Sequence, residues 1–98
     1  MALTLLVQLW AKPGCEQLLV DYEDQVLARL ETYGAKILQR VRTADAGDAD
    51  GPFEAHVLEF PSEAALDEYM ADPHRVALSD LRDRAIARTD LRRVTVVA

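Results

Sequence analysis

The residues best suited to proton chemistry lie in one short segment, FEAHVLEF, residues 53 to 60. Glu54 and His56 are two positions apart, so in a strand their side chains share one face. Arg40 and Arg42, on the preceding segment, could face the same pair. An imidazole beside a carboxylate can act as a general base near neutral pH, and the arginines could orient an anionic ligand. The same residues could instead form a hydrogen-bonded network that fixes the register between two subunits.

His74 is the second candidate for a catalytic base. It follows Pro73 in the first turn of a predicted helix, where the helix dipole disfavours its charged form. A neutral imidazole there could position a substrate. The alternative is a helix-edge histidine half packed beneath the first helix, because the sequence offers His74 no matched carboxylate.

Aromatic side chains are candidates for the walls of a binding pocket. A site for a flat substrate could be lined by the aromatic residues Trp10, Tyr22, Tyr33, Phe60 and Tyr69, with Arg40 as a contact for an anionic group. Aromatic residues at helical spacing are also ordinary core residues. The sequence leaves both interpretations open.

Motifs for metals and cofactors are not found. A metal site needs several convergent His, Cys or carboxylate ligands, and the chain has two histidines and one cysteine, Cys15. The acidic segment with Asp45, Asp48 and Asp50 lacks the closing glutamate of a calcium loop, so we expect a solvated turn. No glycine-rich phosphate loop, nucleophile elbow or haem-attachment motif occurs. We therefore expect neither a metal nor a cofactor.

Composition and charge limit the classes of partner. The 98 residues, 50% of them hydrophobic, favour a single globular domain over residues 1–98. Eleven Lys and Arg against seventeen Asp and Glu give a net charge of −6, which disfavours nucleic acid and anionic lipid. The apolar run at residues 3 to 10 is too short to span a bilayer and lacks the layout of a signal peptide. We expect a cytoplasmic protein that binds neither nucleic acids nor membranes.

The hydrophobic periodicity predicts the elements that position the candidate residues. Alternation predicts strands over residues 3 to 11, 35 to 43, 53 to 60 and 91 to 98. Three- and four-residue steps predict a helix over residues 15 to 33. Ser62 and Asp72 are suited to cap two successive short helices, with Pro73 at the first position of the second. The order β-α-β-β-α-β, with its second helical region in two pieces, predicts a ferredoxin-like α+β fold with a four-stranded antiparallel sheet.

The alternation also predicts two different sheet faces, one of which the helices cover. The predicted core face carries Leu3, Leu5, Val7, Leu9, Ala35, Ile37, Val41, Phe53, Ala55, Val57, Val94 and Val96. The opposite face mixes large apolar residues with polar ones: Leu6, Trp10, Leu38, Leu58, Phe60, Leu91 and Val97 with Thr4, Gln8, Lys36, Arg40, Arg42, Glu54, His56, Arg93 and Thr95. So many large apolar residues predict that a second sheet covers this face in a homodimer. The alternative is a solvated sheet with some exposed leucines.

The third strand ending in HVLEF, the step PSEAALDEYMADP, the following amphipathic helix and the valine-rich last strand resemble the dimeric α/β-barrel superfamily. That superfamily includes antibiotic-biosynthesis monooxygenases, muconolactone isomerase, ether-degradation accessory proteins and small uncharacterised proteins. The resemblance covers nearly the whole chain in element order, and its motif is structural rather than catalytic. It implies a dimer whose two sheets pack into a barrel, with one pocket per subunit between sheet and helices.

Three functional hypotheses follow from the sequence. The first is a small homodimer with a small-molecule pocket and no assigned activity. The second is a cofactor-independent monooxygenase or isomerase of a small aromatic or polyketide-like compound, with His56 or His74 as base and Trp10 together with Tyr22 or Tyr69 as walls. The third is a non-catalytic interaction module. A cavity with converging polar groups would favour the enzyme, and a filled core would favour the module.

Overall fold

The computed structural model describes residues 2–44 and 50–98, so Asp45 and Asp48 of the predicted acidic turn lie outside the described residues. The elements are β1 (Leu3–Ala11), α1 (Glu16–Leu27), the short 3-10 helix η1 (Leu30–Tyr33), β2 (Lys36–Arg42), β3 (Glu54–Phe60), α2 (Glu63–Met70), α3 (Pro73–Ala77), α4 (Ser79–Ala85) and β4 (Ile86–Val94). This order confirms the predicted β-α-β-β-α-β arrangement, with the second helical region in three pieces rather than two.

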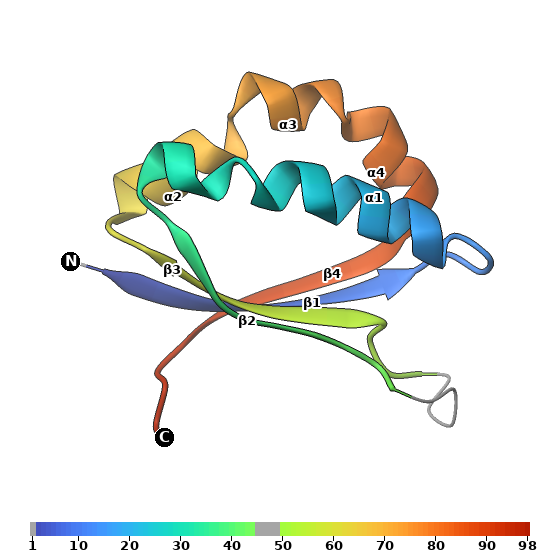
Figure 1. Ribbon diagram of the computed structural model, residues 1–98, viewed down its shortest axis with the longest axis horizontal. Helices are drawn as coiled ribbons and strands as arrows, with labels where there is room; N and C mark the ends of the chain where they lie inside the picture. The colour runs from blue at the N-terminus through green and yellow to red at the C-terminus, as the bar shows by residue number, and fades with distance from the viewer. Residues whose placement is uncertain (1, 45–49) are drawn as a thin grey trace.

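The four strands form one antiparallel sheet in the order β2-β3-β1-β4. Figure 1 shows all the helices on one side of this curved sheet, with α3 arching away from it. The fold is therefore ferredoxin-like, as predicted. Within the described part of the chain, no helix is both long enough and apolar enough to cross a lipid bilayer.

Side-chain caps and glycines set the ends of the helices. The Ser62 hydroxyl accepts a hydrogen bond from the Ala65 amide at 3.1 Å, which confirms Ser62 as the N-cap of α2. The helix predicted over residues 15 to 33 is instead α1 followed by η1. Gly34 then ends η1 with a φ of 71°, a left-handed conformation that glycine adopts without strain.

β3 presents the opposite face to the helices from the one predicted. Glu54, His56, Leu58 and Phe60 are buried beneath the helices, so the prediction that Val57 belongs to the core and His56 to the mixed face is wrong. The two faces of FEAHVLEF have similar apolar content, so alternation alone does not choose between them. The polar face can be buried here because it brings its own hydrogen-bonding and charge partners, described below.

β4 begins earlier than predicted and is also turned over. It starts at Ile86, directly after α4, and ends at Val94, whereas the predicted strand covers residues 91 to 98. Leu91 pairs with Val7 and therefore faces the helices, while Val94 pairs with Thr4 on the uncovered face. Of the predicted core face, the β1 residues Leu5, Val7 and Leu9 are confirmed. The alternation that predicts β1 is the clearest strand pattern in the sequence.

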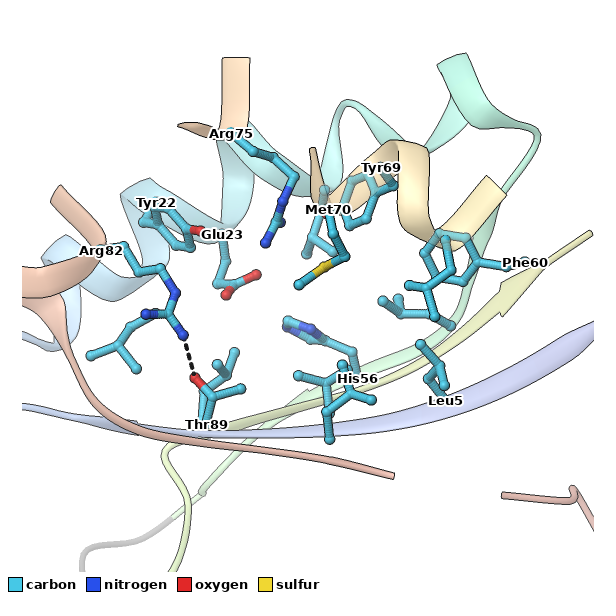
Figure 2. Close-up of a pocket in the computed structure, with 17 residues that line it drawn as sticks. Leu5, Tyr22, Glu23, His56, Phe60, Tyr69, Met70, Arg75, Arg82 and Thr89 are labelled. Carbon is cyan, nitrogen blue, oxygen red and sulfur yellow. Dashed lines mark hydrogen bonds between the residues drawn. The ribbon is translucent and has the colours of Figure 1, made fainter. Parts of the chain in front are cut away.

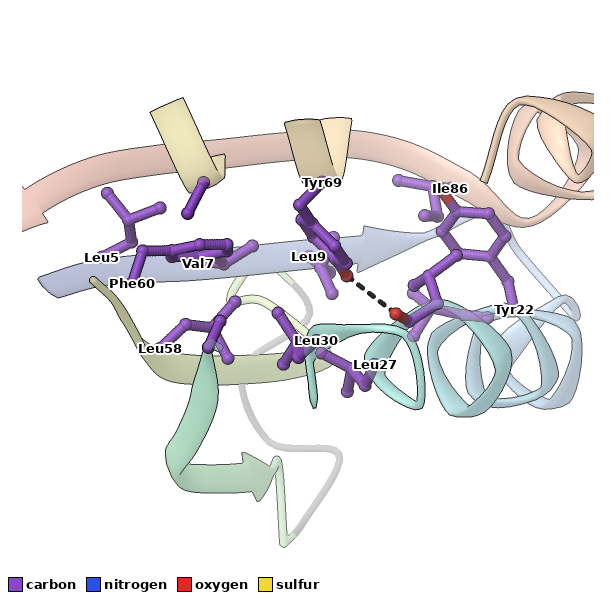
Figure 3. Close-up of a cluster of buried hydrophobic side chains, with 14 of the residues drawn as sticks. Leu5, Val7, Leu9, Tyr22, Leu27, Leu30, Leu58, Phe60, Tyr69 and Ile86 are labelled. Carbon is purple, nitrogen blue, oxygen red and sulfur yellow. Dashed lines mark hydrogen bonds between the residues drawn. The ribbon is translucent and has the colours of Figure 1, made fainter. Parts of the chain in front are cut away.

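The core lies between the sheet and the helices. Figure 3 shows Leu9, Tyr22, Leu27 and Tyr69 within this layer. The Tyr69 hydroxyl donates a hydrogen bond to the Val26 carbonyl at 2.9 Å, which joins α2 to α1 (Figure 3). A buried phenol thus has its polar group satisfied, and the two helices are fixed relative to each other.

Asp72 explains why the chain breaks after α2. One carboxylate oxygen accepts hydrogen bonds from the backbone amides of His74, at 2.7 Å, and Arg75, at 3.3 Å, and so caps α3. The other accepts from the Tyr33 hydroxyl and from Arg29 Nη2 at 3.1 Å. The Tyr33 bond opposes the effect of burial, and with the other donors it lowers the pKa of Asp72 well below its ordinary value. The first turn of α3, which carries Arg75, is therefore held against α1 and η1.

The prediction from this junction is that Asp72→Ala destabilises the protein. Losing a helix cap typically costs about 1 kcal/mol, which lowers the melting temperature of a domain this size by ~4–8 °C, and the lost Arg29 and Tyr33 contacts add to that. Thermal unfolding, followed by circular dichroism, measures this fall in melting temperature. Asp67→Ala, an exposed position on α2, is the matched control. Equal melting temperatures for the two variants would show that Asp72 does not hold the junction.

Candidate acid-base cavity

A cavity of about 170 Å³ lies between the sheet and the helices. Apolar residues form most of its wall, among them Leu5, Val7, Leu58, Phe60 and Ile86. Figure 2 shows polar side chains entering it from both layers: Glu23, Arg75 and Arg82 from the helices, and His56 and Thr89 from the sheet. A mostly apolar cavity with a few converging polar groups is the usual form of a small-molecule site.

The floor of the cavity holds a buried His56–Glu54 pair. His56 Nε2 lies 2.5 Å from Glu54 Oε2, and the two residues are 2% and 1% exposed. Glu54 also accepts hydrogen bonds from Arg42 Nε at 2.6 Å and Arg40 Nε at 3.1 Å. Burial alone would raise the pKa of Glu54, but the bonds from His56, Arg42 and Arg40 together lower it to about 2. Since an ionised carboxylate only accepts, His56 must carry a proton on Nε2.

Glu23 is a second buried carboxyl group of the cavity, and unlike Glu54 it receives no hydrogen bonds from the neighbouring side chains that the structure describes. It is 5% exposed, and no residue in the described ranges forms a hydrogen bond or an ion pair with its side chain. Burial raises its pKa from 4.5 to about 7, with His56 opposing the rise and Glu54 adding to it. A carboxyl group with such a pKa can both take and give a proton near neutral pH.

Two arginines enter from the helices. The Arg75 guanidinium lies over the Tyr69 ring, with Cζ 4.5 Å from the ring centroid. Arg82 Nη2 donates to the Thr89 hydroxyl at 3.2 Å, a contact that joins α4 to β4 (Figure 2). Arg82 and Thr89 are exposed, as are Met70 and Leu91 in the same cavity wall. The cavity therefore opens between α2, α4 and β4.

Glu23, Glu54 and His56 are also of the right types to hold a metal ion. Their ligand atoms lie within 4.8 Å of one another, which sequence spacing does not reveal. However, both oxygens of Glu54 already accept hydrogen bonds from arginines or from His56. These groups supply the positive charge that a divalent cation would bring, so the arrangement suits proton transfer better than metal binding.

The structure brings some of the predicted site residues together and separates others. His56, Tyr22 and Tyr69 line the cavity, and Arg40 supports it through Glu54 without lining it. Burial raises the pKa of Tyr69 to about 12, and its hydroxyl already donates to Val26, so it serves as a wall. His56 occupies the helix-covered face rather than the mixed face on which it was predicted.

Trp10 and His74 do not line the cavity. Trp10 lies on the uncovered sheet face, where Arg88 stacks on its ring at 4.4 Å and its indole nitrogen donates to the Asp50 carbonyl. His74 is exposed on α3. Their predicted binding and catalytic roles stay predictions, and neither residue shares the cavity with His56.

Sequence reasoning missed Glu23 and Arg75, two charged residues of the cavity wall that form no ion pair with another described residue. The signal for Glu23 is its place in the apolar stripe of α1, four residues after Leu19 and three before Val26. A charged residue in the middle of such a stripe must be buried. Arg75 carries no comparable signal, because its direction depends on how Asp72 caps α3.

Comparisons with known proteins identify the fold and no family. No family model matches the chain, and no curated protein does. Among solved structures, a putative antibiotic biosynthesis monooxygenase from Bacteroides thetaiotaomicron is 14% identical, with a TM-score of 0.80 over 99% of this chain and 90% of that one. A dabb family protein with a ferredoxin-like fold from Mesorhizobium loti is 17% identical, with a TM-score of 0.70 over 99% and 98%.

A third similar structure, a protein of unknown function from Rhodopseudomonas palustris, is 17% identical and has a TM-score of 0.79 over 99% of this chain and 83% of that one. At these identities the similarity establishes the fold alone. It agrees with the predicted resemblance to ferredoxin-like, monooxygenase-like proteins, and it transfers no site residue.

The raised pKa of Glu23 predicts a pH-dependent effect of Glu23→Gln on stability. Between pH 4.5 and about 7 the folded state keeps a proton on Glu23 that the unfolded state has lost. Glu23 therefore favours folding below pH 4.5, and this contribution is lost as the pH rises through 7. Glutamine mimics the protonated form at every pH, so the variant should match the wild type near pH 4.5 and exceed its stability above pH 7 by up to roughly 3 kcal/mol.

Urea unfolding of both proteins across this pH range measures the difference. Glu31→Gln, the same change at an exposed position of η1, is the control and should show no such pH dependence. A stability difference between Glu23→Gln and wild type that stays constant with pH would contradict the raised pKa.

Proposed function

We propose that the protein binds a small one-ring compound in this cavity and transfers a proton on it, as an isomerase of an unsaturated ketone does. The size of the cavity supports this, because an engineered apolar cavity of roughly 150 Å³ binds benzene. The compound's ring would lie against the apolar wall formed by residues such as Leu58, Phe60 and Ile86. Larger substituents would extend through the opening beside Met70 and Leu91.

The observation that carries the proposal is the buried, uncompensated carboxyl group of Glu23 beside His56. Burying a carboxylate without partners costs free energy, so such a group is a candidate for function. Its raised pKa leaves part of the population ionised near neutral pH, ready to act as a base. Figure 2 shows Glu23 and His56 entering the same space from opposite layers.

In the proposed reaction Glu23 takes a proton from the carbon next to the ketone carbonyl. The electrons of that C–H bond form an enolate, with its negative charge on the carbonyl oxygen. Glu23 then returns the proton to the far carbon of the double-bond system, giving the conjugated ketone. His56, held by Glu54, lies beside Glu23 and lowers the pKa of its carboxyl group, which favours the ionised form that takes the proton. Nothing is oxidised or reduced.

The oxygenase alternative begins with the same proton removal and remains a prediction. There dioxygen would react with the carbanion and convert a CH₂ group of the substrate to a carbonyl, with release of water. The names of the solved neighbours are compatible with it, but their identity to this chain is too low to choose between the two reactions. The interaction module is disfavoured, because the cavity contains converging polar groups. The expected cytoplasmic location belongs to the proposal as well.

We also propose that the protein is a homodimer whose subunits pack through their uncovered sheet faces. The prediction that Val41 belongs to the core face is wrong, because an irregularity in β2 between Ile37 and Gln39 turns the rest of that strand over. With β3 and β4 turned over as well, the uncovered face carries Leu6, Trp10, Val41, Val57 and Val94. Val41 is 48% exposed, which is unusual for a large aliphatic residue within a strand. A second copy would cover this apolar stripe.

The enzyme proposal predicts that the protein accelerates conversion of a one-ring β,γ-unsaturated ketone to its conjugated isomer. Ultraviolet absorbance of the conjugated product follows the reaction. Because glutamine cannot accept a proton, Glu23→Gln should lower kcat by roughly a hundredfold or more, while Glu31→Gln keeps the wild-type rate. A wild-type rate no faster than buffer across a panel of such ketones, or an unimpaired Glu23→Gln variant, would overturn the proposal.

The dimer proposal predicts a solution mass of twice the 10.9 kDa of one chain. Light scattering coupled to size exclusion measures this mass. Val57→Lys places a charge on the uncovered face and should shift the protein towards monomer, because a buried unpaired charge is costly. Val76→Lys, the same change at an exposed position of α3, should remain dimeric. A monomeric wild type would refute the dimer.

A further inference from the structure

Arg75 holds a buried hydrogen-bond donor that the fold does not use. Its Nε atom is buried and has no hydrogen-bond partner among the residues that the structure describes. Such a donor costs free energy unless something else satisfies it. Since the guanidinium is charged at every relevant pH, the missing partner is best supplied by an oxygen that carries negative charge.

Other arginines around the cavity are already paired. Arg40 and Arg42 bond Glu54, Arg29 bonds Asp72, and Arg82 donates to Thr89. Arg75 contacts the Tyr69 ring instead, and in the described ranges it forms no ion pair within 4.0 Å. Glu23 points into the same cavity, yet the two charges do not pair (Figure 2). An unpaired base and an unpaired guanidinium thus share one apolar space.

We infer that Arg75 binds the anionic oxygen of the ligand, so that the cavity selects one-ring compounds with a phenolate or enolate oxygen. This rests on the proposed function, in which a proton leaves the ring compound and negative charge develops on its oxygen. Glu23 takes the proton and becomes ionised, while Arg75 stabilises the oxygen that becomes charged. The apolar wall excludes water and strengthens that interaction.

The orientation of Arg75 comes from its neighbours in the fold. The Asp72 carboxylate accepts from the Arg75 amide and fixes the first turn of α3. The Tyr69 ring then supports the guanidinium from one side, and that ring is itself fixed by its bond to Val26. A donor held in this way needs little reorganisation when a ligand binds.

The test uses para-nitrophenol, whose phenolate form is yellow, and para-nitrotoluene, which has a methyl group in place of the hydroxyl. Equilibrium dialysis gives the affinity, and the absorbance spectrum shows the ionisation state of the bound phenol. Wild type should bind para-nitrophenol as the phenolate and prefer it to para-nitrotoluene by at least about tenfold, as expected for a charge-assisted hydrogen bond. Arg75→Met keeps an apolar chain against Tyr69 and should lose both the preference and the yellow bound form.

Arg88→Met is the matched control, because Arg88 also stacks on an aromatic ring but lies on the uncovered face. It should behave as wild type. If Arg75→Met does not fold, Arg75→Gln replaces it. Phenolate binding that is unchanged by Arg75 substitution, or a wild type that binds neither probe, overturns the inference.

Glu23→Gln separates this inference from the proposed function. It should retain phenolate binding, because glutamine removes a carboxylate that would repel the anion. If Glu23→Gln abolishes isomerisation while Arg75→Met still binds the phenolate, the proposed function stands and the role of Arg75 fails. If Arg75→Met loses phenolate binding while Glu23→Gln remains active, the role of Arg75 stands and the proton transfer fails.

Discussion

The compensation of buried charge between the sheet and the helices determines how the rest of this structure is arranged. Glu54 can be buried because His56, Arg40 and Arg42 all bond its carboxylate. That cluster sets which face of β3 the helices cover, and it places His56 at the floor of the cavity. A hydrophobic core alone would have allowed the opposite face.

Glu23 and Arg75 face this cluster across the cavity, but neither forms a hydrogen bond or an ion pair with it. Each is held by a helix whose position is fixed elsewhere: α1 by the Tyr69–Val26 bond, and α3 by Asp72. The split after α2 therefore has a structural consequence, since it directs Arg75 into the cavity towards the sheet. Among the described residues, Arg75 Nε is a buried donor without a hydrogen-bond partner and the Glu23 side chain forms no ion pair, so both are available for a ligand.

The sequence predicts the element order well and the chemistry only in part. Ser62 and Asp72 act as N-caps as expected, because capping is a local interaction with a local signal. The predicted face of β3 is wrong because FEAHVLEF is nearly balanced between its two faces, and the bonds that compensate the buried Glu54 carboxylate, not alternation, decide which face is covered. Glu23 was visible as a charge within an apolar stripe, whereas the direction of Arg75 depends on tertiary contacts that no spacing reveals.

The most direct test of the account is a carbon NMR titration of the glutamate side-chain carboxyl groups, with the Glu23→Gln variant to assign the Glu23 resonance. The account predicts one resonance that titrates near pH 7, far above the ordinary 4.5, and that is missing in the variant. If the Glu23 resonance titrates near 4.5 instead, the carboxyl group is neither desolvated nor poised for proton transfer, and the central claim is contradicted.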